Sequence, residues 1–300
     1  MAAVQPHFFT LTGNLLAERT LEFSTWSAGA TQRARRETFQ VGGKGINVAK
    51  MLARLGTPHT ALCFTGGATG AECEAWLRER GFSFRSFSSQ TATRAGVVVR
   101  GGEHAETTFL GPDVAPSADA LAQCAEFLDA QGDGNVLALC GSAPGWADET
   151  YAPVRTALER WAARGVLVVD SYGPPLGWAV QQPTALVKIN ATELRGLAVG
   201  SEAVPERLEK LRREAQVQRW IVTGGPGAVW VCDRETAPIS FTPPPVQEVS
   251  ATGSGDVLLA CVLELFCRQS MALKEAVQHA LPYASANAAH PGIAEFVLPV

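Results

Sequence analysis

Two continuous apolar runs, VLALC at residues 136–140 and VLVVD at residues 166–170, flank a helical pattern from Glu149 to Arg164. Strands that are apolar at every position are typical of parallel sheets, because helices cover both faces of such sheets. A strand, a helix and a second strand of this kind form one β-α-β unit. The stretch therefore predicts an α/β fold built on a parallel sheet.

The same alternation extends in both directions along the chain. Further helices are predicted at 46–55, 71–80, 118–130, 202–215, 254–267 and 273–289, and further strands at 59–64, 185–188 and 220–223. Two β-like stretches, 7–40 and 92–110, do not fit this sheet. We predict one α/β domain over residues 1–300: a doubly wound, mostly parallel sheet with helices on both faces, plus a small β-sheet lid from about 14–40 and 92–110.

The composition favours a small-molecule partner. The 300 residues are 46% hydrophobic and 18% charged, with a net charge of −4, so the chain lacks the basic surface that binds nucleic acid or anionic membranes. No apolar run is long enough to cross a bilayer. Residues 1–6 lack the charged start of a secretory signal, and the seven cysteines contain no C-x-x-C pair. These features predict a cytoplasmic protein with reduced, buried thiols.

Several glycine motifs can be excluded. Four G-x-G pairs begin at residues 43, 132, 225 and 253, but each lacks the third glycine of the dinucleotide-binding fingerprint. The pair Gly43-Lys44 has neither the glycine five residues before it nor the following Ser or Thr of a Walker A loop. A G-x-S-x-G elbow is also absent from the sequence. A Rossmann dehydrogenase, a P-loop enzyme and an α/β-hydrolase are therefore disfavoured.

The segment ATGSGD, residues 251–256, directly precedes an apolar helix. Glycines there let successive backbone N–H groups point at one place, and the helix N-terminus adds positive potential, so the segment predicts an anion-binding site. Asp256 has two interpretations. It either stabilises the helix dipole or acts as a general base beside a phosphoryl group.

A second cluster, GGKGIN at residues 42–47, also opens a helix. By itself it could be a tight turn with Lys44 in solvent. Two anion-receptive helix starts in one chain, however, suit a substrate and a nucleotide.

Taken together, GGKGINVA at 42–49 and TGSGD at 252–256 resemble the two signatures of the PfkB, or ribokinase-like, carbohydrate kinases. The similarity extends to Thr93-Arg94, GSAPG at 141–145, Asp170, LVKIN at 186–190 with Glu193, and TGGPG at 223–227. The first motif is more like the phosphofructokinase and tagatose-phosphate kinase branch, which phosphorylates sugar phosphates.

The resemblance implies ATP and Mg²⁺ as cofactors and gives roles to individual residues. Asp256 would be the base, and the transferring phosphoryl group would be held by Gly253, Ser254 and Gly255. Residues on the ATP side would be Lys188, Asn190, Thr223, Gly225 and Gly227. Asn190 and Glu193 match an N-x-x-E element that organises Mg²⁺, largely through water.

On the substrate side, the resemblance places Gly42, Gly43, Asn47 and Ser142 at the sugar. Arg94 would hold the phosphate already on the substrate, with Lys44 adding charge there. Without the family context, Arg94 could be an ordinary surface arginine of the lid. The lid itself suggests a homodimer, because a partner often covers exposed sheet edges and apolar lid faces.

One departure concerns the sugar. The branch usually has N-P-A-x-D near its N-terminus, whereas this chain has NLLAE at 14–18, which puts Glu18 where the family has an aspartate that grips hydroxyls. The longer side chain changes which hydroxyl can be reached. The expected substrate is fructose 1-phosphate, fructose 6-phosphate or tagatose 6-phosphate, which would be converted to a bisphosphate. Alternatives are a kinase of an unphosphorylated sugar or nucleoside, and a non-catalytic sensor of the same fold.

Overall fold

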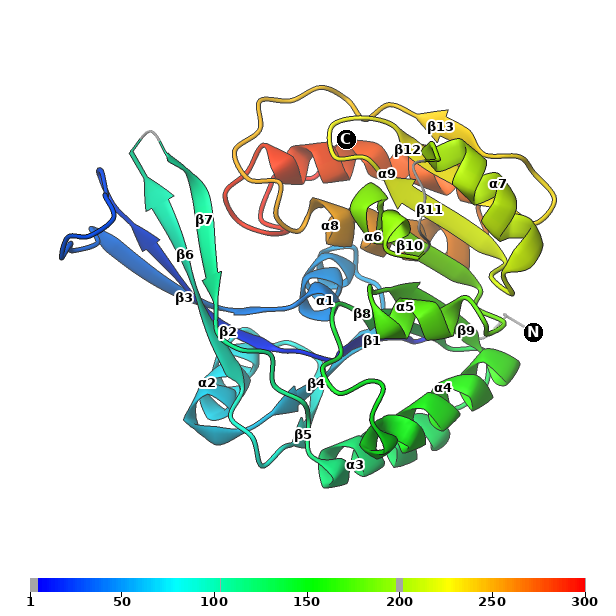
Figure 1. Ribbon diagram of the computed structural model, residues 1–300, viewed down its shortest axis with the longest axis horizontal. Coiled ribbons are helices and arrows are strands. Elements are labelled where there is room, and N and C mark those ends of the chain that lie inside the picture. The colour runs from blue at the N-terminus through cyan, green and yellow to red at the C-terminus, as the bar shows by residue number, and fades with distance from the viewer. Residues whose placement is uncertain (1–4, 103, 198–201, 300) are drawn as a thin grey trace.

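The computed structural model describes residues 5–102, 104–197 and 202–299 (Figure 1). The expectation about a secretory signal concerns residues 1–6, of which 1–4 lie outside this range, so it stays a sequence prediction. No helix in the described ranges has the length and apolar character needed to cross a membrane.

Within these residues the central sheet has nine strands in the order β13-β12-β11-β10-β9-β8-β1-β4-β5. Their bounds are β1 Phe8–Thr12, β4 His59–Thr65, β5 Phe84–Ser88, β8 Val136–Cys140, β9 Val166–Asp170, β10 Leu186–Asn190, β11 Arg219–Thr223, β12 Val229–Asp233 and β13 Ile239–Phe241. All neighbours from β5 to β11 pair parallel, and β12 and β13 add an antiparallel edge. The expectation of a doubly wound, mostly parallel sheet is confirmed.

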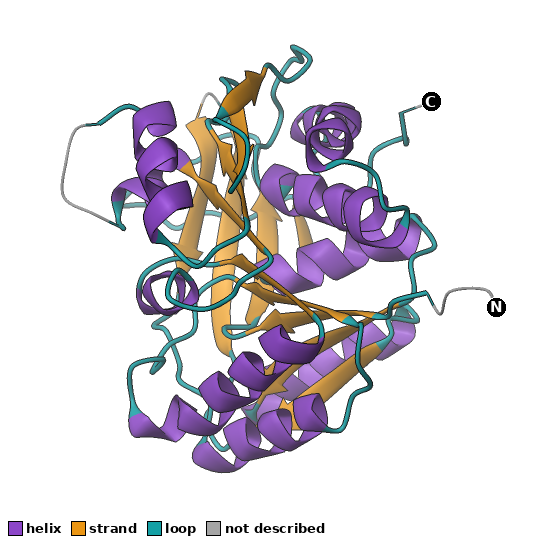
Figure 2. Ribbon diagram, turned by 90° about the vertical axis from the view of Figure 1, so that its right-hand side faces the viewer, coloured by secondary structure: helices purple, strands orange, loops and turns teal. Residues whose placement is uncertain are grey.

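Helices cover both faces of this sheet, as Figure 2 shows. They are α1 Lys44–Arg54, α2 Gly67–Glu79, α3 Ala118–Asp129, α4 Ala152–Arg164, α5 Pro174–Ala179, α6 Ala191–Arg195, α7 Val204–Glu214, α8 Ser254–Val262 and α9 Leu273–Ala288. A short 3₁₀ helix spans Glu149–Tyr151, and a π-helical turn at Leu263–Arg268 continues α8. On β1, Phe9 and Leu11 pack with α3 and α4, whereas Phe8 packs with α1, α8 and α9. This alternation along one strand produces the two helical layers.

A second, four-stranded sheet projects from one side of the body (Figure 1). It comprises β2 Leu16–Glu22, β3 Arg36–Gly42, β6 Arg94–Gly101 and β7 His104–Leu110, in the order β3-β2-β6-β7. The central pair, β2 and β6, is parallel, and the outer pairs are antiparallel. We call this sheet the lid. Its Glu106 lies 3.3 Å from the hydroxyl of Thr252, so the lid contacts the segment before α8.

The structure corrects the prediction that residues 7–40 lie outside the central sheet. Phe8–Thr12 is a central strand of that sheet, paired with β4 and β8, and the lid begins only at Leu16. All five residues of β1 are buried, because helices cover both of its faces. The sequence pattern also did not predict β5, β12 and β13, which lie at the sheet edges, or the short helices α5 and α6.

Candidate active site

The candidate site lies at the carboxyl edge of the central sheet. In open parallel sheets, ligands bind where the strand order changes direction. Here the chain runs from β1 to β4 and β5 on one side and from β8 to β11 on the other. The strands that face this point end at Thr12, Cys140, Asp170, Asn190 and Thr223.

Asp170, at the end of β9, is fully buried and binds two lysines. Its Oδ1 accepts a hydrogen bond from Lys44 Nζ at 2.8 Å, and its Oδ2 accepts one from Lys188 Nζ at 2.7 Å. Burial alone would raise the pKa of Asp170, but the two ammonium groups outweigh it and hold the pKa below its usual value. Burial likewise disfavours the charged form of Lys44, yet Asp170, Glu193 and Asp256 raise its pKa above the usual value. Asp170 and Lys44 are therefore ionised at neutral pH.

Asp256 lies in the first turn of α8 and is almost completely buried. Its Oδ2 accepts a hydrogen bond from Asn47 Nδ2 at 2.8 Å. Burial, followed by repulsion from Asp170, raises the pKa of Asp256 to about 6 despite the nearby lysines. Its side chain does not cap the helix. A carboxylate whose pKa approaches neutrality is suited to accept a proton, which favours the general-base interpretation.

The TGSGD segment forms a tight turn at the start of α8. Gly253 has φ +80°, and a Cβ there would lie 2.5 Å from Ile293 Cγ2, so both the backbone and the space require glycine. At Gly255 a Cβ would lie 2.6 Å from Lys188 Nζ, which places that ammonium directly beside the turn. Asn287 of α9 donates to the Thr252 carbonyl at 3.0 Å and supports the segment. The glycine turn and one cation thus meet at the helix start, where the helix N-terminus adds positive potential.

The GGKGIN cluster meets the first one through Asn47. Gly43 has φ +125°, and a Cβ there would lie 2.7 Å from Thr12 Cγ2, so α1 approaches the end of β1 closely. Asn47 uses its amide nitrogen to bind Asp256, while its Oδ1 is buried without a partner among the described residues. The structure therefore brings together the two motifs that the sequence singled out, more than 200 residues apart.

A cleft of about 760 Å³ opens over these groups. Its lining includes Lys44, Asn47, Lys188, Asn190, Thr223, Gly225 and the segment Ala251–Asp256. Pro243, Pro244, Pro245 and Ala288 contribute apolar wall. Of the residues expected on the nucleotide side, Gly227 is absent from the lining and closes the neighbouring turn by donating to the Gly224 carbonyl. The size and mixed lining of the cleft suit a nucleotide.

Asn190 and Glu193 form a capping box at the start of α6. Asn190 Oδ1 accepts from the Glu193 backbone at 2.9 Å, and Glu193 Oε2 accepts from the Asn190 backbone at 2.8 Å. Glu193 Oε1 binds Lys44 at 3.0 Å. In the described part of the chain, no cluster of three His, Cys, Asp or Glu side chains is placed to hold a metal. These residues fit a Mg²⁺ carried by phosphates and contacted through water, rather than a direct protein site.

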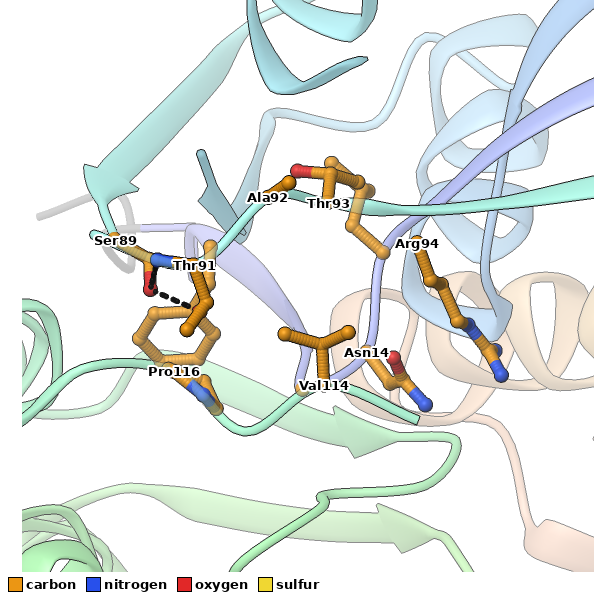
Figure 3. A pocket seen from close by; sticks show the side chains of 11 residues that line it. Asn14, Ser89, Thr91, Ala92, Thr93, Arg94, Val114 and Pro116 are labelled. Atoms are coloured by element: carbon orange, nitrogen blue, oxygen red, sulfur yellow. Dashed lines mark hydrogen bonds between the residues drawn. The ribbon is translucent and has the colours of Figure 1, made fainter. Parts of the chain in front are cut away.

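Arg94, the first residue of β6, lines a separate small pocket together with Asn14 and Thr93 (Figure 3). Its guanidinium donates to Asp113 Oδ1 at 2.8 Å, and Asn14 donates to the same oxygen at 2.8 Å and to Ser142 Oγ at 2.9 Å. The Arg94 side chain is only 12% exposed, and its Nε has no partner among the described residues, so it is not an ordinary surface arginine. Lys44 binds Asp170 and Glu193 instead, so the two cations occupy different clusters.

Glu18 lies on β2 beside the first glycine cluster. A Cβ at Gly42 would lie 3.4 Å from Glu18 Oε2, so this carboxylate faces the motif. Glu18 is 8% exposed, and its Oε1 accepts a hydrogen bond from Gln40 on β3. The position agrees with the expected substrate side of the site.

Three residues that organise the site had no role predicted from the sequence, namely Asn14, Asp113 and Asp170. Asp113 lies in a loop without a motif of its own, and Asn14 is the first residue of the NLLAE segment, in which only Glu18 was given a role. Asp170 carried a usable signal, since it is a charged residue at the carboxyl end of an apolar parallel strand, where ligands bind.

A family model described as pfkB family carbohydrate kinase matches residues 14–299. The chain is 29% identical over 286 residues to a 1-phosphofructokinase of Bacillus subtilis (strain 168), covering 93% of this chain and 92% of that protein. It is also 29% identical over 271 residues to an ATP-dependent 6-phosphofructokinase isozyme 2 of Escherichia coli (strain K12), covering 87% and 85%.

Solved structures agree with the observed fold. The tetrameric inhibited form of phosphofructokinase-2 from Escherichia coli superposes with a TM-score of 0.85 and 25% identity, covering 95% of this chain and 94% of that one. The central sheet and the lid together therefore follow a known arrangement.

The charge coupling within the site gives a testable prediction. Asp170→Asn should lower the pKa of Asp256 below about 6, because it removes one repelling carboxylate and leaves Lys44 and Lys188 in place. A pH titration of ¹³C-labelled aspartate carboxyl groups by NMR, with Asp256→Asn for assignment, measures the shift. Asp129→Asn, on the surface beside Arg160, is the control. An unchanged or raised pKa of Asp256 contradicts the coupling.

Proposed function

Because this chain belongs to the pfkB family of carbohydrate kinases, we propose that it transfers the γ-phosphoryl group of ATP to a phosphorylated ketohexose. Fructose 1-phosphate, fructose 6-phosphate and tagatose 6-phosphate are the candidate acceptors, and the product is a bisphosphate. The observation that carries the proposal is the buried Asp256 carboxylate beside a glycine turn and two lysines. Relatives named 1-phosphofructokinase and 6-phosphofructokinase support the substrate class.

The reaction needs a base and a place for negative charge. Asp256 removes the proton from the acceptor hydroxyl while the oxygen of that hydroxyl bonds to the γ-phosphorus. The bond from that phosphorus to the bridging oxygen breaks, and ADP leaves with the electron pair. Asn47 holds the Asp256 carboxylate at 2.8 Å, so the base is already oriented.

We assign the transferring phosphoryl group to the turn Gly253, Ser254 and Gly255, and Lys188, whose Nζ would lie 2.6 Å from a Cβ at Gly255, adds a positive charge at the same turn. Phosphoryl transfer depends mostly on positioning and charge stabilisation of this kind. Asn190, Thr223 and Gly225 line the ATP side of the cleft. Mg²⁺ would enter with ATP and neutralise its phosphates, and Asn190 and Glu193 would contact it through water.

On the acceptor side, Arg94 holds the phosphate already present on the sugar. Its guanidinium meets the Asp113 carboxylate in this structure, and a substrate phosphate offers the same type of bond with more charge. Asp113 is 58% exposed and can turn toward solvent when the phosphate arrives. Ser142, Asn47 and Glu18 are the groups we assign to sugar hydroxyls.

The function is tested by ADP release from Mg-ATP across fructose, ribose, adenosine and the three sugar phosphates. We expect turnover of one phosphorylated ketose. Asp256→Asn should lower kcat by about 10² or more and change sugar binding only several-fold, as expected for loss of a general base. In the wild type, kcat/KM should fall as pH drops through about 6, because protonation removes the base. Turnover that survives Asp256→Asn rules out this role.

Arg94→Ala tests the phosphate clamp. The variant should raise KM for the phosphorylated ketose by about tenfold or more, since a charge-assisted bond is lost, and should change KM for ATP little. Steady-state kinetics with the sugar phosphate and with the free sugar distinguish the loss of a phosphate contact from a general loss of sugar binding. Arg195→Ala on α6 is a control on an exposed arginine. Equal effects on both sugars would remove the clamp role.

We also propose that two copies associate through the lid. Phe109 and Leu110 on β7, an edge strand, are 56% and 54% exposed. A related phosphofructokinase-2 is described as tetrameric, so the architecture is compatible with association. Phe109→Glu should convert a dimer into a monomer in light scattering, whereas Ile239→Glu at the far sheet edge should not. A monomeric wild type contradicts the proposal.

A further inference from the structure

Lys50 is a buried lysine for which the reaction gives no role. It lies on α1, is 9% exposed, and donates a hydrogen bond to Gln40 Oε1 at 3.0 Å. Its ammonium also lies 5.3 Å from the centre of the Trp76 ring. A lysine is rarely buried without a reason, because its charge must leave water.

Gln40 connects this lysine to the substrate side. Its Oε1 accepts from Lys50, and its Nε2 donates to Glu18 Oε1. The β2 and β3 register places Glu18 directly opposite Gln40, so the pair is a cross-strand contact of the lid. A continuous chain of hydrogen bonds therefore runs from α1 through the lid to the Glu18 carboxylate.

The donors and acceptors in this series of hydrogen bonds allow only one orientation of the Gln40 side-chain amide. An ammonium can only donate and an ionised carboxylate can only accept, so a flipped Gln40 would lose both bonds. Glu18 Oε1 is thereby occupied. Its Oε2 faces Gly42, in the glycine cluster, and accepts no hydrogen bond from the described residues.

The charges around Lys50 come from several elements. Burial is the main effect and lowers the pKa of Lys50 to about 8, while Glu18, Glu295 and Asp256 favour its charged form and Arg80 opposes it. Lys50 is thus charged at neutral pH and loses its proton just above it. Without that charge the amine can accept as well as donate, so it no longer fixes the orientation of the Gln40 amide.

We propose that Gln40 and Lys50 are positioning residues that hold Glu18 with Oε2 directed at a sugar hydroxyl, and that this arrangement determines which ketohexose epimer is accepted. The inference rests on the proposed function. It extends that function, because it assigns substrate discrimination to two residues that act through a third.

The experiment compares Lys50→Met, Gln40→Leu and Lys50→Arg with wild type, using fructose and tagatose phosphates, which differ in configuration at C4. Lys50→Met and Gln40→Leu should lower kcat/KM for the preferred sugar phosphate by roughly ten- to a hundredfold, mainly through KM, and should reduce the ratio between the epimers. KM for ATP should stay within about twofold. Lys50→Arg, which keeps the charge, should recover part of the ratio. Lys274→Met, exposed on α9, is the matched control.

A pH series gives a readout that a purely structural role would not move. In the wild type, kcat/KM for the preferred sugar should fall above about pH 8, and this decline should be absent in Lys50→Arg. Folded Lys50→Met and Gln40→Leu proteins that keep the wild-type epimer ratio overturn the inference while leaving the kinase function intact. A wild type that turns over none of the sugar phosphates overturns the proposed function, and this inference with it.

Discussion

The arrangement of the site depends on one fully buried carboxylate, that of Asp170, which binds Lys44 with one oxygen and Lys188 with the other. The three residues come from β9, α1 and β10. Burying any of these charges alone would cost several kcal/mol, so the pairing fixes the start of α1 against the edge of the sheet. It also separates two neighbouring carboxylates by function: Asp170 stays ionised, and the pKa of Asp256 is raised toward neutrality. In the same environment, Asp170 is thus an ionised carboxylate that holds two lysines, and Asp256 is a carboxyl group able to exchange a proton.

The lid carries two of the residues that we assign to the acceptor, and it is not a separate unit. Glu18 and Arg94 lie on its two central strands, while Asn47, Ser142 and Asp256 belong to the body. Hydrogen bonds join the lid to the body beside the start of α8. Near the glycine turn, Glu106 meets Thr252, and Arg100 donates to the Pro291 carbonyl at 2.8 Å. A movement of the lid therefore acts on the segment that would hold the phosphoryl group.

The sequence was most informative where glycines and helix starts combine. The motifs GGKGIN and TGSGD identified Asn47, Gly253 and Asp256. The motifs are recognisable because close approach of neighbouring atoms or a positive φ leaves little choice of residue at their glycines. It was least informative where strand patterns are alike: Phe8–Thr12 resembles the lid strands that follow it, and only its helical cover on both faces shows that it is central. The Gln40 and Lys50 pair could not be predicted, since it depends on how a lid strand lies over α1.

The parallel pairing of β2 with β6 has a consequence for how the protein folds. These strands are separated in sequence by β3 of the lid and then by α1, β4, α2 and β5, which belong to the body. Closing so long a loop is entropically costly until the intervening segments have formed, so the lid sheet is completed after that part of the core. The lid therefore becomes ordered only once α1, β4, α2 and β5 have formed. Because β2 and β3 connect β1 to α1, the lid cannot be removed from the chain without also cutting a connection of the core.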